Sequence, residues 1–265
     1  GGHTDTHSIK LRNKEIRVDT GFIVCNDRNY KNFLKLLDDC GVNLNDSDMS
    51  YSASIDGKTW CSKDFFKPSY YFSILNIKFL INILKFNQLG RKKIDDKLPI
   101  SEWLNLNKFP KSFAENYIYP MSSAIWSMSI DQMYNFPTNR FLSFFNNHGL
   151  LDIFNRPQWY SIKNGSSSYI KKILKKTNVK NVYLSKIISI QRGKNNITIK
   201  SDKVKAKYDY VIFTCNTKQI NQILVDQTED EAKAYSFFEY SNNKTVLHND
   251  TSLMPKNLSK WSSWN

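Results

Sequence analysis

The stretch YDYVIFTCNTKQINQIL, residues 208–224, carries the pattern that decides the fold expected for this chain. Its first half, 208–215, is a nearly continuous apolar run, which is typical of a strand buried on both faces of a parallel sheet. Its second half has helical character, with Asn216 or Thr217 suited to be the helix N-cap. A strand that passes directly into a helix indicates an α/β unit.

The turn between that strand and that helix is a candidate ligand site. In open α/β sheets, ligands bind outside the carboxyl ends of the strands. Cys215 and Asn216 occupy this position, where a nucleotide could bind. An ordinary strand-to-helix connection is the alternative interpretation.

The elements around this unit divide the chain into three parts. The outer parts are rich in predicted strands, and the middle part, about 69–160, is rich in predicted helices. We therefore expect one α/β domain built from two distant segments and interrupted by a helical insertion. Strands or hairpins are predicted at 7–26, 50–60, 158–162, 182–184, 187–192, 197–202 and 208–215, and helices at 29–40, 69–88, 101–108, 111–125, 138–147, 164–176 and 216–224.

The composition allows a large core and a negatively charged partner. Of the 265 residues, 40% are hydrophobic and 14% aromatic, which is enough for a substantial core. The net charge of +14 favours nucleic acid or a membrane surface as partner, although Lys is abundant throughout the chain, as a coding bias would make it. Because no basic stripe is interleaved with aromatic residues, we predict no nucleic-acid partner.

The most apolar stretch, YYFSILNIKFLINILKF at 70–86, is short for a membrane span and contains Asn76, Lys78 and Asn82. An amphipathic or buried helix is predicted there, and peripheral membrane contact through it is the alternative.

Cysteine usage indicates a reducing, cytoplasmic compartment. The four cysteines include no CxxC pair, and they are too few for a disulfide framework in a chain of this length. No signal peptide is visible. The absence of HExxH, GxSxG and GxxxxGK[ST] argues against a zinc hydrolase, an α/β-hydrolase and a P-loop enzyme.

Three short stretches allow both a structural and a functional interpretation. GGHT, residues 1–4, is either a turn or a close backbone approach to a phosphate or ribose. The glycine of VDTGFIV, 18–24, marks either a bulge or a place where a ligand meets the backbone. The small residues of PMSSAIWS, 120–127, allow close helix packing or a flat ligand.

Taken in order, the segments GGHT, VDTGFIVCNDRNYKNFLKLL, PMSSAIWS, NHGLL, RPQWYSIKNGSSSYI, YDYVIFTCNTKQINQIL, VLHNDTSLMP and WSSWN resemble the flavin-containing amine oxidase superfamily. The resemblance covers nearly the whole chain and is closest to the bacterial branch of predicted NAD/FAD-binding amine oxidoreductases. It implies an α/β fold, with an incomplete Rossmann-like FAD-binding domain (1–28 and 161–225) interleaved with a helical or α+β substrate domain (29–160 and 226–265).

The resemblance also implies an internal fragment. In the family, a strand, a G-x-G-x-x-G turn, a helix and a second strand come before the position of GGHT, and another flavin-binding segment follows the position of WSSWN. Neither occurs in these 265 residues. Since the G-x-G-x-x-G turn and its helix hold the pyrophosphate, we expect the chain alone to bind FAD weakly or not at all.

The resemblance implies a set of site residues but no catalytic residue. The residues implied for FAD are Gly1, Gly2, His3 and Thr4 at the pyrophosphate and ribityl side, Asp19, Thr20, Gly21 and Phe22 at the isoalloxazine ring, Ile187 or Ile188 at the adenine, and Cys215 with Asn216 beside the cofactor. Trp126 and Trp264 are implied for the substrate cavity. One departure is Asn164-Gly165-Ser166, where the family usually has two glycines before the serine.

The leading hypothesis is an FAD-dependent oxidoreductase that transfers a hydride from a substrate C–H bond to the flavin. Its substrate would be a small molecule, either an amine or an apolar, lipid-like compound. The alternative is a non-catalytic basic module that binds a membrane surface or nucleic acid.

Overall fold

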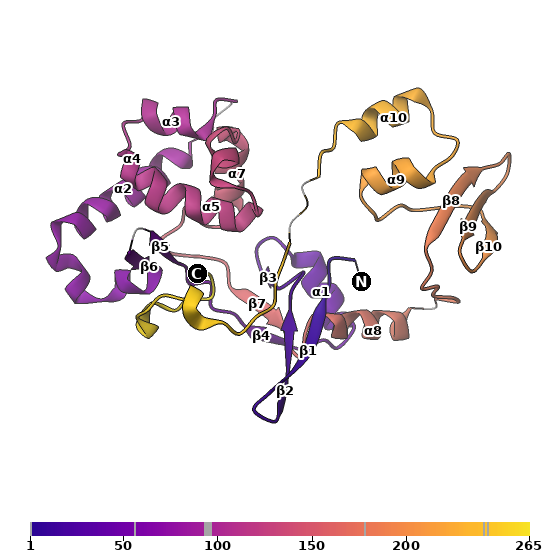
Figure 1. The fold of residues 1–265 in the computed structure, drawn as a ribbon, viewed down its shortest axis with the longest axis horizontal. Helices are drawn as coiled ribbons and strands as arrows, with labels where there is room; N and C mark the ends of the chain where they lie inside the picture. The colour runs from indigo at the N-terminus through magenta and orange to yellow at the C-terminus, as the bar shows by residue number, and fades with distance from the viewer. Residues whose placement is uncertain (1, 56, 93–96, 178, 241, 243) are drawn as a thin grey trace. The chain divides into compact units, whose positions relative to one another are not determined.

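The computed structural model describes residues 1–265 except 1, 56, 93–96, 178, 241 and 243. The chain forms two compact units (Figure 1). The larger unit comprises Thr4–Lys172 and Val246–Asn265, and the smaller unit comprises Gly1–His3 and Ile173–Thr245. The functional domain boundaries implied by the resemblance stay a prediction.

The larger unit begins with an antiparallel hairpin of β1 (Thr6–Leu11) and β2 (Lys14–Asp19). Its turn is at Arg12 and Asn13, which both have positive φ, 47° and 64°. The hairpin confirms the prediction of paired strands at the start of the chain.

A small antiparallel sheet then brings distant segments of the larger unit together. β3 (Val24–Asn26) and β4 (Leu44–Asp46) both pair with β7 (Trp159–Ile162), so that β7 is the central strand. The predicted strand at 158–162 is therefore confirmed.

The helix α1 (Lys31–Asp39) connects β3 to β4 and covers a small core of Leu37, Val42 and Ile162. It stops before Gly41, whose φ of +64° is the left-handed conformation that commonly ends helices.

The other hairpin of the larger unit, β5 (Ser52–Ile55) and β6 (Lys58–Cys61), receives the end of the chain. The backbone N–H of Ser52 donates to the carbonyl of Trp264 at 2.8 Å. The buried carboxylate of Asp64 pairs with Lys67 and with Lys260 of the C-terminal segment. These contacts hold the last residues against the hairpin.

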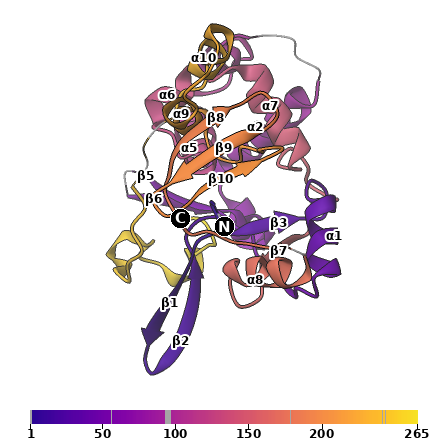
Figure 2. The same ribbon diagram turned by 90° about the vertical axis from the view of Figure 1, so that its right-hand side faces the viewer.

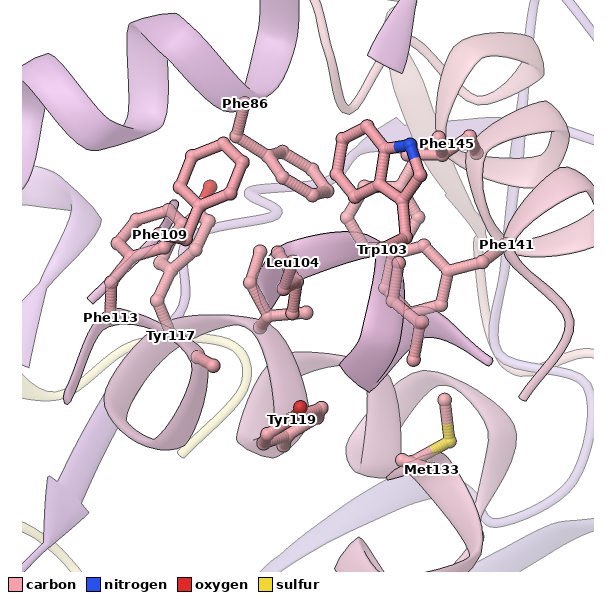
Figure 3. Packing of buried hydrophobic residues seen from close by; sticks show 14 of the residues in the cluster. Phe86, Trp103, Leu104, Phe109, Phe113, Tyr117, Tyr119, Met133, Phe141 and Phe145 are labelled. Carbon is pink, nitrogen blue, oxygen red and sulfur yellow. The ribbon is translucent and has the colours of Figure 1, made fainter. Parts of the chain in front are cut away.

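The helical part of the larger unit contains the main core (Figure 3). The ring of Phe86 is fully buried and meets the edges or faces of five other aromatic rings. Two 3-10 helices, Ser62–Phe66 and Pro68–Phe72, precede these helices, and a π-helical turn at Ala114–Ile118 joins two of them. The helices are α2 (Ile74–Gly90), α3 (Ile100–Leu106), α4 (Lys111–Phe113), α5 (Tyr119–Trp126), α6 (Ile130–Tyr134) and α7 (Thr138–Asn147).

The helices predicted from periodicity are confirmed, with small shifts of their ends, whereas the short α6 and a later helix, α10 (Glu229–Ser236), were not predicted. Another helix, α8 (Ser167–Lys176), follows β7 and contains the boundary between the two units. None of the helices in the described part of the chain is long and apolar enough to cross a membrane.

The smaller unit is a three-stranded antiparallel sheet with two helices (Figure 2). The strand order is β10-β9-β8, and a core of Ile190, Ile220 and Leu224 lies between β8 and α9. The elements are β8 (Ile187–Arg192), β9 (Ile197–Ser201), β10 (Lys205–Tyr208), α9 (Thr217–Ile223) and α10 (Glu229–Ser236).

Two strand predictions in the smaller unit are wrong. Residues 182–184 form no strand, and the apolar run at 208–215 belongs to a strand only at Tyr208, the last residue of β10. In that run Val211 and Phe213 pack on the core, whereas Tyr210 and Ile212 are 89% and 87% exposed. A buried parallel strand needs a hydrogen-bonding neighbour on each side, and every pairing between named strands in the described residues is antiparallel.

Candidate functional site

A groove of about 850 Å³ lies in the larger unit. This volume is in the range of small-molecule sites. Its walls come from β2 and the loop after it, from β4 and β7, and from the loop before α8. The lining residues are Glu15, Ile16, Arg17, Val18, Asp19, Ile23, Asn45, Ser161, Ile162, Asn164 and Gly165.

Asp19, predicted to lie against a flavin ring, is fixed at one wall of this groove by hydrogen bonds. Its carboxylate accepts from the backbone N–H of Ser166 at 2.9 and 3.0 Å, and from the hydroxyl of Thr6 at 2.5 Å. The backbone N–H of Ser167 donates to the same Thr6 oxygen at 2.9 Å. Asp19 and Thr6 thus satisfy two amides at the N-terminus of α8 that have no partner within the helix.

The backbone at Asn164 and Gly165 makes this junction possible. Gly165 has φ +86°, and a Cβ there would lie 2.4 Å from the methyl carbon of Thr6, so only glycine fits without a shift. Asn164 also has positive φ, 68°, which asparagine tolerates better than most residues. Asn164, where the sequence departs from the expected pair of glycines, therefore also has a left-handed backbone. The hydroxyl of Ser166 donates to the carbonyl of Phe22 at 2.6 Å, which completes the link between the two segments.

Thr4 and Thr20, two further predicted cofactor residues, hydrogen-bond to neighbours in the larger unit. Thr20 donates to Asp5 from both its backbone N–H and its hydroxyl, each at 2.9 Å. Hydrogen bonds from Thr20 and then from His7 lower the pKa of Asp5. The hydroxyl of Thr4 is hydrogen-bonded to the hydroxyl of Tyr169 on α8.

Gly21 and Phe22 continue the predicted segment beyond Asp19 and Thr20. Gly21 is exposed. The half-buried ring of Phe22 meets Phe33 edge-on at 5.4 Å between centroids, and Phe33 meets Tyr169 in the same way at 5.4 Å. This aromatic row packs α1 and α8 against the predicted segment.

The residues predicted at the adenine and at the turn after 208–215 lie in the smaller unit. Ile187 begins β8, and Ile188 is the extra residue of a β-bulge between Ile187 and Ser189. The thiol of Cys215 is free and exposed. Of the two predicted N-cap candidates, Asn216 is the N-cap of α9, because its side chain accepts from the backbone N–H of Gln219 at 2.9 Å.

The first residues of the chain are placed in part. Gly1 lies outside the described residues. Gly2 has φ +64° with no atom within 4 Å of where a Cβ would be, and His3 is exposed. The roles implied for these residues stay predictions.

The two tryptophans predicted for the substrate cavity lie in the larger unit, and neither lines the groove. Trp126 packs against the rings of Phe136 and Phe144, at 4.7 and 4.8 Å between centroids. Trp264 bonds through its backbone to Ser50 and Ser52 beside β5. Their part in a substrate cavity stays a prediction.

Several residues of the groove and its support were not predicted from the sequence. Thr6 and Tyr169 carry no local signal for the bonds that they make. Arg17 lines the groove and donates from Nη1 to the carbonyl of Asn164 at 3.2 Å, again across a large separation in sequence. The serine run after Gly165 was the one usable signal, since serines are common at helix N-termini.

The residues that line the groove suit the isoalloxazine ring of a flavin better than its diphosphate. Ile16, Val18, Ile23 and Ile162 supply apolar surface, and the charged residues of the lining are Glu15, Arg17 and Asp19. The first amides of α8, which could otherwise hold a phosphate, are already bonded to Asp19 and Thr6. No group of three or more His, Cys, Asp or Glu side chains within the described ranges could hold a metal ion.

Neither protein-family models nor curated proteins match this chain. Solved structures do match, at low identity, and show a common fold. A cyclohexylamine oxidase from Brevibacterium oxydans IH-35A matches with a TM-score of 0.65 at 13% identity, and a putrescine oxidase bound to putrescine with 0.64 at 11%. A fatty acid isomerase from P. acnes that produces CLA matches with 0.60 at 16%. Each match covers 89% of this chain and 55% of the other, so the chain spans about half the length of these structures. The chain thus has a mixed α and β fold that corresponds to part of the flavin amine oxidase fold.

Proposed function

We propose that this chain belongs to an FAD-dependent oxidoreductase whose flavin ring binds in the groove beside Asp19 and Gly165. The main support is the meeting of two distant segments, VDTGF and NGSSS, at one groove wall in a chain with part of the flavin amine oxidase fold. In this proposal residues 1–28 and 161–225 belong to the cofactor domain and the helical part belongs to the substrate domain.

The groove residues would bind and orient the cofactor. When bound, the flavin would accept a hydride from a substrate C–H bond. The carboxylate of Asp19 already accepts hydrogen bonds from Ser166 and Thr6, so its task is to hold the backbone of 19–22 in place and not to move a proton.

The substrate is proposed as a class only. The similar structures include oxidases named for putrescine and cyclohexylamine and an isomerase named for a fatty acid. An amine or an apolar, lipid-like molecule is therefore the substrate class to test. The net charge of +14 keeps a non-catalytic basic module as the second candidate.

The test uses the natural gene product and two tryptophan variants of it. Ile23, in the loop between β2 and β3, lines the groove and is 46% exposed, whereas Leu11 at the end of β1 lies outside the groove and is 45% exposed. Ile23→Trp should lower the flavin content or affinity by about tenfold, equivalent to about 1.4 kcal/mol, because the indole fills the groove. Leu11→Trp should leave flavin binding unchanged.

The bound flavin should also be bleached without oxygen by an amine or by an unsaturated fatty acid. A natural gene product that contains no flavin would overturn the proposal, and salt-sensitive retention on DNA or anionic vesicles would then favour the basic module. Equal flavin binding by the two variants would overturn the assignment of the groove.

A further inference from the structure

The larger unit exposes an apolar patch at the start of its helical part. Two phenylalanines, Phe66 and Phe72, are 89% and 88% exposed, which is far more than a phenyl ring usually shows in a folded protein. The apolar patch consists of Phe66, Phe72, Ile74, Leu75, Ile81 and Leu84, each at least 50% exposed.

These residues come from adjacent elements. The 3-10 helix Ser62–Phe66 packs on the 3-10 helix Pro68–Phe72, which in turn packs on α2 (Figure 1). Along α2 the exposed residues Ile74, Ile81 and Leu84 recur at spacings of seven and three residues, so that these three lie on one face. The opposite face, with Ile83 and Phe86, is buried in the main core. The helix is therefore apolar on both sides, and the described residues cover only one of them.

Positive side chains outnumber negative ones in the sequence that forms the apolar patch, although Lys63 pairs with Asp48 and Arg91 pairs with Asp152. Residues 62–92 contain five lysines and one arginine, against a single acidic residue, Asp64. The side chain of Asp64 is only 4% exposed and pairs with Lys67 and Lys260, so it presents little negative charge to the solvent. Lys78 lies among the exposed apolar residues of α2.

We infer that the apolar patch binds the surface of an anionic lipid bilayer. Exposed aromatic and aliphatic side chains enter the boundary between headgroups and acyl chains, while neighbouring lysines meet the lipid phosphates. The long lysine side chains can reach the headgroups while their carbon chains lie along apolar surface. With 17 residues, α2 lies in the interface in this arrangement and does not cross the bilayer.

The same charges argue against a second copy of the chain as the occupant. A symmetric dimer through this face would bring the same apolar patch, and thus the same lysines, of two copies together. Like charges placed opposite one another disfavour such a contact. An anionic surface satisfies both the apolar and the charged side chains.

The experiment measures binding of the natural gene product to vesicles of phosphatidylglycerol and of phosphatidylcholine by sedimentation. We expect binding to the anionic vesicles that weakens as salt is added. Phe66→Ser with Phe72→Ser should weaken it about a hundredfold, taking about tenfold for each ring. Phe154→Ser is the matched control, because Phe154 is 85% exposed and lies outside the apolar patch.

A second pair of variants tests how much lysine charge contributes to vesicle binding. Lys78→Gln should weaken binding to phosphatidylglycerol about fivefold, whereas Lys175→Gln on α8 should change it less. Equal binding by the double phenylalanine variant and by Phe154→Ser would overturn the inference. It would also be overturned by a stable dimer in solution that the double variant dissociates, since the apolar patch would then be a subunit interface. Neither readout depends on flavin, so this result is separate from that of the proposed function.

Discussion

Replacing Gly165 by alanine should destabilise the larger unit at the junction that holds Asp19. The added Cβ would lie 2.4 Å from the methyl carbon of Thr6, well inside an ordinary carbon–carbon contact of about 3.5–4.0 Å. The backbone φ of +86° adds about 1 kcal/mol for any residue with a Cβ.

The remaining loss of stability comes from the shift that the added Cβ would force on Thr6. Thr6 donates to Asp19 at 2.5 Å and accepts from the backbone N–H of Ser167 at 2.9 Å. Losing both bonds costs about 1 kcal/mol each, so Gly165→Ala should lower the free energy of unfolding by about 3 kcal/mol in total.

Urea unfolding followed by tryptophan fluorescence measures this loss for the relevant part of the chain. All six tryptophans lie in the larger unit, so their signal reports on that unit alone. A second variant, Thr6→Ser, removes the clashing methyl group and keeps the hydroxyl.

The double variant Gly165→Ala with Thr6→Ser should therefore recover about 2 kcal/mol relative to the sum of the single losses. The reasoning is refuted if Gly165→Ala costs less than about 1 kcal/mol, or if the two losses simply add.

Three further predictions concern the core, the C-terminal segment and the thiols. Phe86→Ala should lower the free energy of unfolding by about 4 kcal/mol in the same assay, since it empties the centre of the aromatic core; a loss below about 2 kcal/mol would contradict the packing described. Burial raises the pKa of Asp64, but its lysine ion pairs outweigh burial and lower the pKa below the ordinary 3.8. The pairs therefore stabilise the fold above about pH 3.8, and this stabilisation is lost as the pH falls further. Asp64→Asn should make the decrease of Tm with falling pH shallower. The same dependence of Tm on pH in the variant and in the parent would argue against this role of Asp64. Burial raises the pKa of Cys25 to about 11, so iodoacetamide at neutral pH should label the exposed Cys215 and leave Cys25 unlabelled until urea is added, as mass spectrometry of peptides would show.

The helices could be predicted from the sequence because their pattern is local. Apolar spacing in 29–40, 69–88 and 138–147 predicted α1, α2 and α7, and Gly41 marked the end of α1. Hairpins with short turns, such as β1 with β2, were predictable for the same reason, since both strands and the turn lie within one short segment.

The pairing of distant strands and the support of the candidate site could not be predicted in this way. The residues of β7 contain no pattern that identifies β3 and β4 as its neighbouring strands. Thr6 is separated by about 160 residues from the amide that it satisfies at Ser167. The sequence predicts that Asp19 faces a ligand, but it contains no sign of the bond between Asp19 and the amide of Ser166.

The run at 208–215 decided the fold expected from the sequence. It also shows which properties the sequence determines and which depend on the tertiary structure. The sequence by itself determined that this segment is apolar and leads into a helix that begins near Asn216 or Thr217. Whether it becomes a strand was decided only by the tertiary structure, because a strand exists through hydrogen bonds to a neighbour and not through its own side chains. The same holds for the groove beside Asp19, which exists because two distant segments meet there.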